Sequence, residues 1–108
     1  MDFASIPDSV LEDALQQLTT FFLKKVRLQD FKGLLTENGL YDCEKVEKNL
    51  SNEDWVLHTL SSVRKCGPGA IPKFFDIFRE DHDNDWILKK IVEVIQNVQG
   101  SEESGNLN

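Results

Sequence analysis

Three aspartates, Asp81, Asp83 and Asp85, have the clearest chemical spacing in the chain, because they alternate like the opening of an EF-hand calcium loop. Such a loop needs a glycine at its sixth position and a bidentate glutamate at its twelfth. Trp86 and Val92 occupy these two positions. The pattern therefore favours an acidic connector that caps the following helix over a calcium site.

Zinc binding and Cys–His catalysis depend on the few cysteines and histidines of the chain. Zinc sites are usually assembled from short spacings such as Cys-x-x-Cys, and none occurs in this sequence. Neither cysteine lies in a turn typical of a catalytic nucleophile. The glycines at 67–69 are not followed by the Lys-Ser/Thr of a phosphate-binding loop. We therefore expect no enzymatic activity, no cofactor and no metal from these candidates: Cys43, His58, Cys66 and His82.

Composition limits the class of protein further. A chain of 108 residues with 40% hydrophobic content has room for one core. Its net charge of −7 disfavours binding to nucleic acid or to anionic lipid, and no apolar run approaches the ~20 residues that span a bilayer. Two cysteines are fewer than a small secreted disulfide scaffold usually carries. These features predict a single-domain cytoplasmic protein without nucleic-acid or membrane partners.

Apolar residues recur at spacings of three and four in successive segments, which predicts an all-α protein. In the first segment this stripe holds until Phe22 and then loses phase, so we expect a bend or break near residues 19–25. Helices with one apolar face each must close on a shared core as an antiparallel bundle. The Ser/Glu/Asn/Gly-rich residues 100–108 are expected to be a disordered tail that begins a linker, after a domain at 1–99. The six expected helices cover about 5–26, 28–38, 42–50, 51–66, 71–78 and 87–98.

Charged residues gather at particular helix ends. Bases end the first and fourth expected helices, and would form one basic patch if those helices packed side by side. Acids crowd the second and third expected helices. An ordinary solvated surface, with bases placed favourably at helix C-termini, is an equally good interpretation from composition alone. The basic residues are Lys24, Lys25, Arg27, Arg64 and Lys65, and the acidic ones are Asp30, Glu37, Asp42, Glu44 and Glu47.

Three large apolar residues, Trp55, Ile77 and Trp86, fall outside the apolar stripes of their helices. Exposed aromatic residues often anchor protein interfaces, so these three are candidate contact residues. Packing on a rim or on a neighbouring loop is the commoner fate of such side chains. The helical phase alone does not separate the two outcomes. By contrast, Val56, Leu57, Leu60 and Val63 are expected to be buried.

A longer segment, Phe31 to Ile91, resembles a caspase-recruitment domain (CARD) of the death-fold superfamily. The resemblance lies in a leucine-rich second helix that exits at Gly-Leu, and in a fourth helix that ends at a glycine before a phenylalanine-rich fifth helix. Pro72 within the fifth-helix motif, and phenylalanine at two positions where leucine is usual, depart from the pattern and keep a death effector domain as an alternative. The segments that carry the resemblance are FKGLLTENGL at 31–40, DWVLHTL at 54–60, GPGAI at 67–71 and FFDIF at 74–78.

This resemblance implies a six-helix Greek-key bundle with a kinked first helix. It further implies a signalling adaptor domain of apoptosis or innate immunity, which binds the CARD of another protein and also copies of itself. In that family a basic patch on the first and fourth helices often meets an acidic patch on the second and third. A helical regulatory domain that inhibits a fused enzyme is the alternative function.

Overall fold

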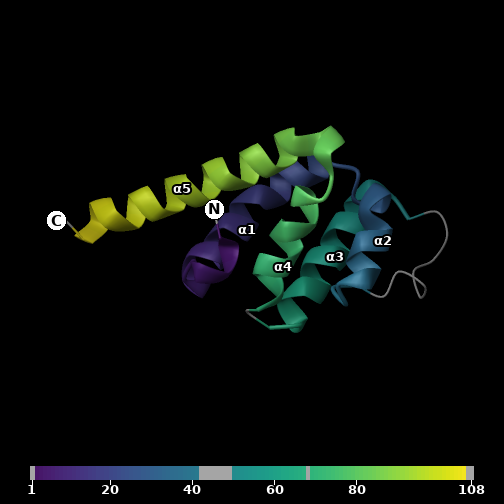
Figure 1. Cartoon of the computed structure of the whole chain (residues 1–108), viewed down its shortest axis with the longest axis horizontal. Coiled ribbons are helices and arrows are strands. Elements are labelled where there is room, and N and C mark those ends of the chain that lie inside the picture. Colours follow the sequence, from purple (N-terminus) through teal and green to yellow (C-terminus); the bar gives the residue numbers. More distant parts are fainter. Residues whose placement is uncertain (1, 42–49, 68, 107–108) are drawn as a thin grey trace.

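The computed structural model describes residues 2–41, 50–67 and 69–106, and all regular secondary structure within these ranges is helical. The predicted all-α class is confirmed. Residues 42–49, which make up nearly all of the expected third helix at 42–50, lie outside the described residues. Figure 1 shows the arrangement of the α-helices, and short 3₁₀ turns connect or precede them. The α-helices are α1 (Asp8–Lys25), α2 (Lys32–Glu37), α3 (Asn52–Lys65), α4 (Ala70–Asp76) and α5 (Asp85–Asn106), and the 3₁₀ turns are η1 (Phe3–Ser5), η2 (Leu28–Phe31), η4 (Ile77–Arg79) and η5 (His82–Asn84).

The predicted apolar stripe of α1 is confirmed. Its core-facing residues lie at the expected spacings of three and four and are fully buried. The helix runs without interruption from Asp8 to Lys25, so of the bend or break expected near residues 19–25, a break is wrong. Thr19 satisfies its hydroxyl by donating to the carbonyl oxygen of Leu15 at 3.1 Å, which keeps this β-branched residue inside the helix. The residues of the stripe are Leu11, Ala14, Leu15, Leu18 and Phe22.

Glycines end α2 and α3 where the sequence predicts. Gly39 has φ of +67° and Gly67 has φ of +97°, a left-handed conformation that glycine adopts without a steric penalty. After α2, the N–H of Leu40 donates to the carbonyl of Leu35 at 3.0 Å, and the N–H of Gly39 donates to the carbonyl of Thr36 at 3.1 Å. This pair of bonds is a Schellman motif, and it brings Leu40 into the core.

Side-chain hydrogen bonds fix the direction of α3 in the bundle. Asn52, at its first turn, donates to the carbonyl oxygens of Leu23 at 3.3 Å and Val26 at 2.8 Å, and accepts from the N–H of Leu28 at 3.2 Å. The start of α3 therefore lies against the end of α1, and these two helices are antiparallel. At the other end of α3, Ser62 donates to the carbonyl of Leu40 at 2.6 Å, so α2 and α3 run in the same direction (Figure 1).

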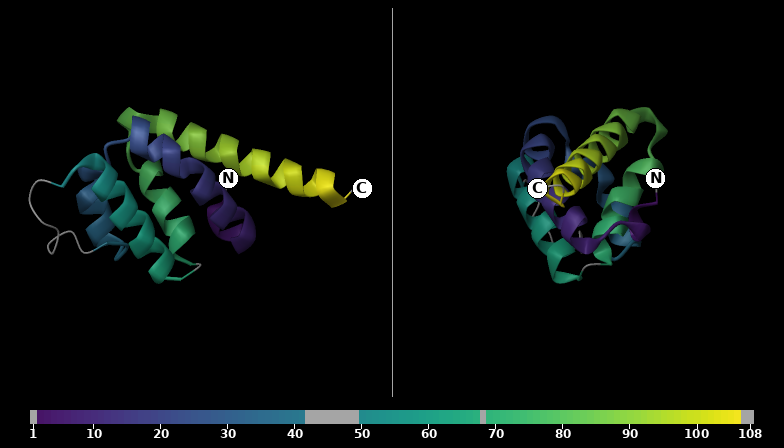
Figure 2. Two further views of the ribbon diagram at one scale, coloured as in Figure 1. Left: turned by 180° about the vertical axis from the view of Figure 1, so that it is seen from behind. Right: turned by 90° about the vertical axis from the view of Figure 1, so that its left-hand side faces the viewer.

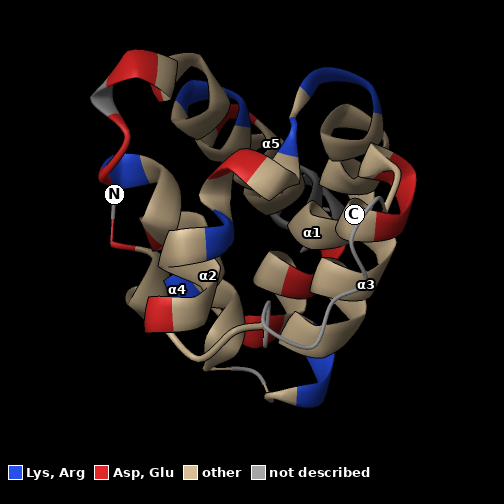
Figure 3. Ribbon diagram, turned by 90° about the vertical axis from the view of Figure 1, so that its right-hand side faces the viewer, with Lys and Arg blue, Asp and Glu red and all other residues tan. Residues whose placement is uncertain are grey.

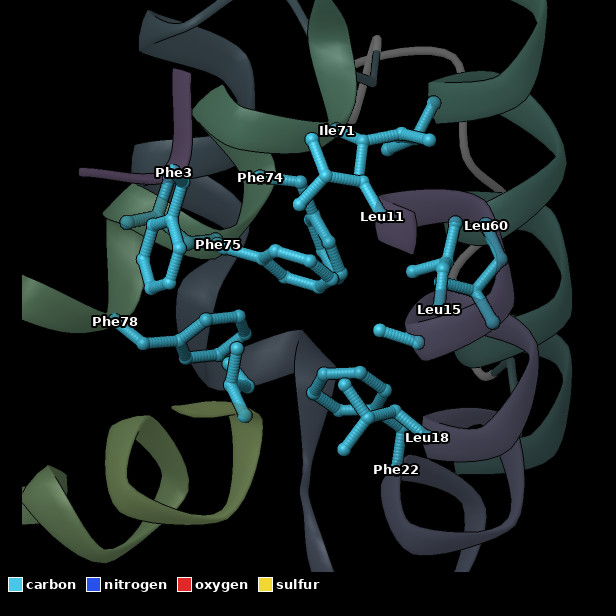
Figure 4. Packing of buried hydrophobic residues seen from close by; sticks show 14 of the residues in the cluster. Phe3, Leu11, Leu15, Leu18, Phe22, Leu60, Ile71, Phe74, Phe75 and Phe78 are labelled. Atoms are coloured by element: carbon cyan, nitrogen blue, oxygen red, sulfur yellow. The ribbon is translucent and has the colours of Figure 1, made fainter. Parts of the chain in front are cut away.

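Phenylalanine rings fill the centre of the bundle. Phe22 of α1 lies with its ring centroid 5.5 Å from that of Phe74, and it stacks on Phe78 at 5.6 Å (Figure 4). Phe3, which the helical stripes did not identify as a core residue, is fully buried and packs edge-on against Phe75 at 5.6 Å. The N-terminal segment is therefore part of the core.

The last helix extends further than its apolar stripe. α5 lies along α1 and continues past the rest of the bundle as far as Asn106 (Figure 2). The helix does not end near residue 98, where its apolar stripe ends, and it includes residues 100–106 of the segment expected to be a disordered tail. A single glycine within a helix costs only about 1 kcal/mol relative to alanine, so Gly100 alone does not stop it.

Thr59 is the one buried polar side chain of the described core without a hydrogen-bond partner at its hydroxyl. An unsatisfied buried hydroxyl destabilises a fold by about 1–3 kcal/mol. The variant Thr59→Val removes this hydroxyl and keeps the shape, so we expect the free energy of unfolding to rise by about that amount in urea denaturation. The matched control is Thr36→Val, since the hydroxyl of Thr36 is exposed and already donates to Lys32. A stability equal to or below that of the unmodified chain would contradict the prediction.

Candidate protein interaction surface

The predicted basic patch is split into two groups. Lys24, Lys25 and Arg27 line one groove at the end of α1 together with Asn52. Arg64 lies near the other end of α3, about 18 Å from Asn52 by helical rise, and there it lines a groove with acidic residues of α1. The cause is the antiparallel packing of α1 and α3, which places their C-terminal bases at opposite ends. In the view of Figure 3, basic segments lie both at the top and at the bottom of the molecule. Lys65 is exposed beside Arg64.

Only two members of the predicted acidic patch, Asp30 and Glu37, lie among the described residues, so the patch as a whole stays a prediction. Asp30 pairs with Arg27, a residue of the basic groove, at 3.7 Å between Oδ1 and Nε. Both side chains are more than half exposed, and such a pair contributes little stability. Glu37 is exposed at the end of α2. The other members, Asp42, Glu44 and Glu47, lie outside the described residues.

Two of the three candidate apolar anchors are buried, which is the commoner fate of such side chains. Trp55 is 5% exposed and packs on Tyr41 at 6.1 Å between ring centroids, a contact with a loop that helical phase does not reveal. Ile77 is 1% exposed because it lies in η4, where a 3₁₀ turn of three residues replaces the α-helical phase. In contrast, Leu57, expected in the core, is 48% exposed.

Trp86 is the candidate anchor that the structure leaves exposed, at 44%. Its position is nevertheless fixed. The indole N–H donates to Oδ1 of Asn84 at 3.2 Å, and the amide of Asn84 donates in turn to Asp81 at 2.6 Å. The ring also packs edge-on against Phe21 of α1, with 5.8 Å between centroids. Trp86 is thus a rigid, half-exposed aromatic side chain at the junction of α1 and α5.

A pair of lysines lies one helical turn after each of the two aromatic residues in this contact. Lys24 and Lys25 follow Phe21 by three and four residues, and Lys89 and Lys90 follow Trp86 by the same spacings, so each pair shares a helix face with its aromatic residue. Lys90 also pairs with Glu93 at 3.7 Å, whereas no acidic residue lies between positions 20 and 29 beside the α1 pair. We call this surface the Trp86 platform; its residues are Phe21, Lys24, Lys25, Trp86, Lys89 and Lys90.

The alternating aspartates act as a helix start in this structure. Oδ1 of Asp81 accepts the backbone N–H of Asp83 at 3.1 Å, and its other oxygen accepts the Asn84 amide. This is the capping role that the sequence favours for the segment. Within the described part of the chain, no three histidine, cysteine or acidic side chains converge as ligands for a metal ion.

Comparison with protein-family models, with curated proteins and with solved structures found no match to this chain. No helix in the described ranges is long and apolar enough to cross a membrane. The surface feature from which a function can be argued is therefore the Trp86 platform, a basic and aromatic patch on a helical bundle.

Proposed function

We propose that this chain is a CARD-type interaction domain, a six-helix death-fold bundle that recruits other copies of the same fold in cytoplasmic signalling. Two features support this proposal: the resemblance of residues 31–91 to a CARD, and the all-helical bundle in which the phenylalanines of that segment are buried. The single observation that carries it is the Trp86 platform. A death effector domain would present the same bundle and remains the closest alternative.

The physical argument begins with the cost of ordering an interface. Side chains that become immobile on binding lose rotamer freedom, and that loss weakens the complex. Phe21 and Asn84 already hold Trp86 in one orientation, so little of this cost remains when a partner covers it. Tryptophan is among the residue types most often found at energetic centres of interfaces. The lysines around it select a partner that carries carboxylates.

Trp86→Ala is expected to weaken self-association by roughly 30-fold or more, which corresponds to about 2 kcal/mol for a central interface residue. Sedimentation velocity over a range of concentrations measures this change, and circular dichroism checks that the fold is retained. Trp86→Phe keeps an aromatic ring and should retain most of the association. Unchanged association of Trp86→Ala, or a monomeric unmodified chain at the highest concentrations, contradicts the proposed function.

The charges of the platform provide a second arm of the same experiment. The double variant K24E/K25E should weaken association and reduce its dependence on salt, because several exposed ion pairs act together at the interface. The matched control is K65E/K73E, which changes the net charge equally at exposed positions away from the platform. Equal effects of the two double variants would indicate that only the net charge matters.

A further inference from the structure

Two large hydrophobic side chains are exposed in the described part of the chain, Trp86 and Leu57 of α3. Glu53 and Asp54 lie four and three residues before it, one helical turn away, and both are exposed. Leu57 is therefore an apolar contact flanked by carboxylates. We call Glu53, Asp54 and Leu57 the Leu57 surface.

Local helix chemistry explains only the acids of this surface. Carboxylates stabilise the first turn of a helix, and the N–H of Asp54 donates to the Ser51 cap at 3.1 Å. Neither effect requires a leucine at position 57. A half-exposed leucine has no role in capping, and burying it against a partner would remove apolar surface from water.

The apolar centres of the two surfaces, Trp86 and Leu57, lie on different sides of α1. Gln16 faces α3, since it lines a groove with Arg64, whereas Phe21 faces α5, since it packs on Trp86. Phe21 follows Gln16 by five positions, and at 100° per residue the two side chains point about 140° apart around the axis of α1. Leu57 precedes Arg64 by seven residues, two helical turns, and so lies on the same side of α3. Trp86 and Leu57 of one molecule are thus on different sides of α1 and cannot cover each other, whereas Lys24 and Lys25 lie at the end of α1 near Asn52.

We infer that the occupant of the Trp86 platform is the Leu57 surface of a second copy. Trp86 and Leu57 would supply an apolar centre, and the lysines of one copy would face Glu53 and Asp54 of the other. This inference rests on the proposed function and names the partner surface within it. Because the two contacting surfaces differ, the interface is heterologous, and repetition of it adds further copies head to tail.

Mixing two variants that are each defective at one surface tests the pairing. Trp86→Ala removes the platform but keeps the Leu57 surface, and Leu57→Ala does the reverse. Each variant alone should self-associate at least tenfold more weakly than the unmodified chain. An equimolar mixture should form heterodimers, since one intact surface of each kind is present, and should stop there because no second intact pair remains. Sedimentation velocity with one variant fluorescently labelled distinguishes dimers from longer oligomers.

The outcomes separate this inference from the proposed function. If Trp86→Ala is monomeric while Leu57→Ala associates like the unmodified chain, the partner surface is wrong and the interaction domain stands. If both variants are monomeric but their mixture forms no heterodimer, the pairing is also overturned. A monomeric unmodified chain overturns both proposals. Lys73→Ala, at an exposed position of α4 outside both surfaces, is the control and should associate normally.

Discussion

Replacing Phe22 with alanine (Phe22→Ala) is expected to lower the free energy of unfolding by about 3–5 kcal/mol, the usual cost of truncating a buried phenylalanine. Phe22 is fully buried, and its ring lies within 5.8 Å, between centroids, of Phe21, Phe74 and Phe78. Truncation leaves a cavity at a point where α1, α4 and η4 meet. A loss of this size is a large part of the 5–15 kcal/mol that stabilises a typical domain.

Urea or guanidinium denaturation followed by circular dichroism measures the effect of Phe22→Ala. Leu57→Ala is the matched control, because it also truncates an apolar side chain but at a position that is 48% exposed. We expect the control to change the free energy of unfolding by less than about 1 kcal/mol. Similar losses for both variants would show that Phe22 is not at the centre of the core.

The second large effect is expected at Asn52. Asn52→Ala removes two donations to the carbonyls of Leu23 and Val26 and one acceptor for the N–H of Leu28. These part-buried groups would lose their partner at the crossing of α1, η2 and α3. Each group left unsatisfied costs about 1–3 kcal/mol, and water that enters the site offsets part of this cost. We therefore expect the free energy of unfolding to fall by about 2 kcal/mol or more.

Asn38→Ala is the control for Asn52→Ala. Asn38 is exposed, and its amide donates only to Leu34 one turn back, so its loss should cost about 0.5 kcal/mol or less. Hydrogen exchange adds a local measurement, because protection of the Leu28 amide should fall in Asn52→Ala. If the two variants have equal stability, the connection between the end of α1 and the start of α3 contributes little.

Helical periodicity predicted most of the core. The stripes around Leu15, Phe74 and Ile95 are buried as expected, and the ends at Gly39 and Ser51 lie where glycine and capping residues predict them. This success has a simple cause, since burial of one helix face and capping of its ends are local properties of the sequence. Phe3 was not identified because it precedes α1 in a 3₁₀ turn, outside any periodic stripe.

The candidate site could be predicted only in part. Phase alone indicated that Trp86 lies outside its stripe, and it is exposed. The same reasoning left burial or exposure open for Trp55, which is buried and packs on Tyr41 in a connecting loop. The joining of Lys24 and Arg64 into one patch failed because the relative direction of two helices is a tertiary property. That direction depends on Asn52, a polar residue whose partners lie more than twenty residues away.

The burial of Phe3 also affects the order in which the chain folds during its synthesis. Phe3 packs on Phe75, and the guanidinium of Arg79, which also pairs with Asp76, lies 4.4 Å from its ring centre. A ribosome adding 5–20 residues per second reaches Arg79 about 4–15 s after Phe3. Throughout that time the aromatic side chain has none of these partners. Phe3 therefore takes its place in the core only after α4 and η4 have left the exit tunnel.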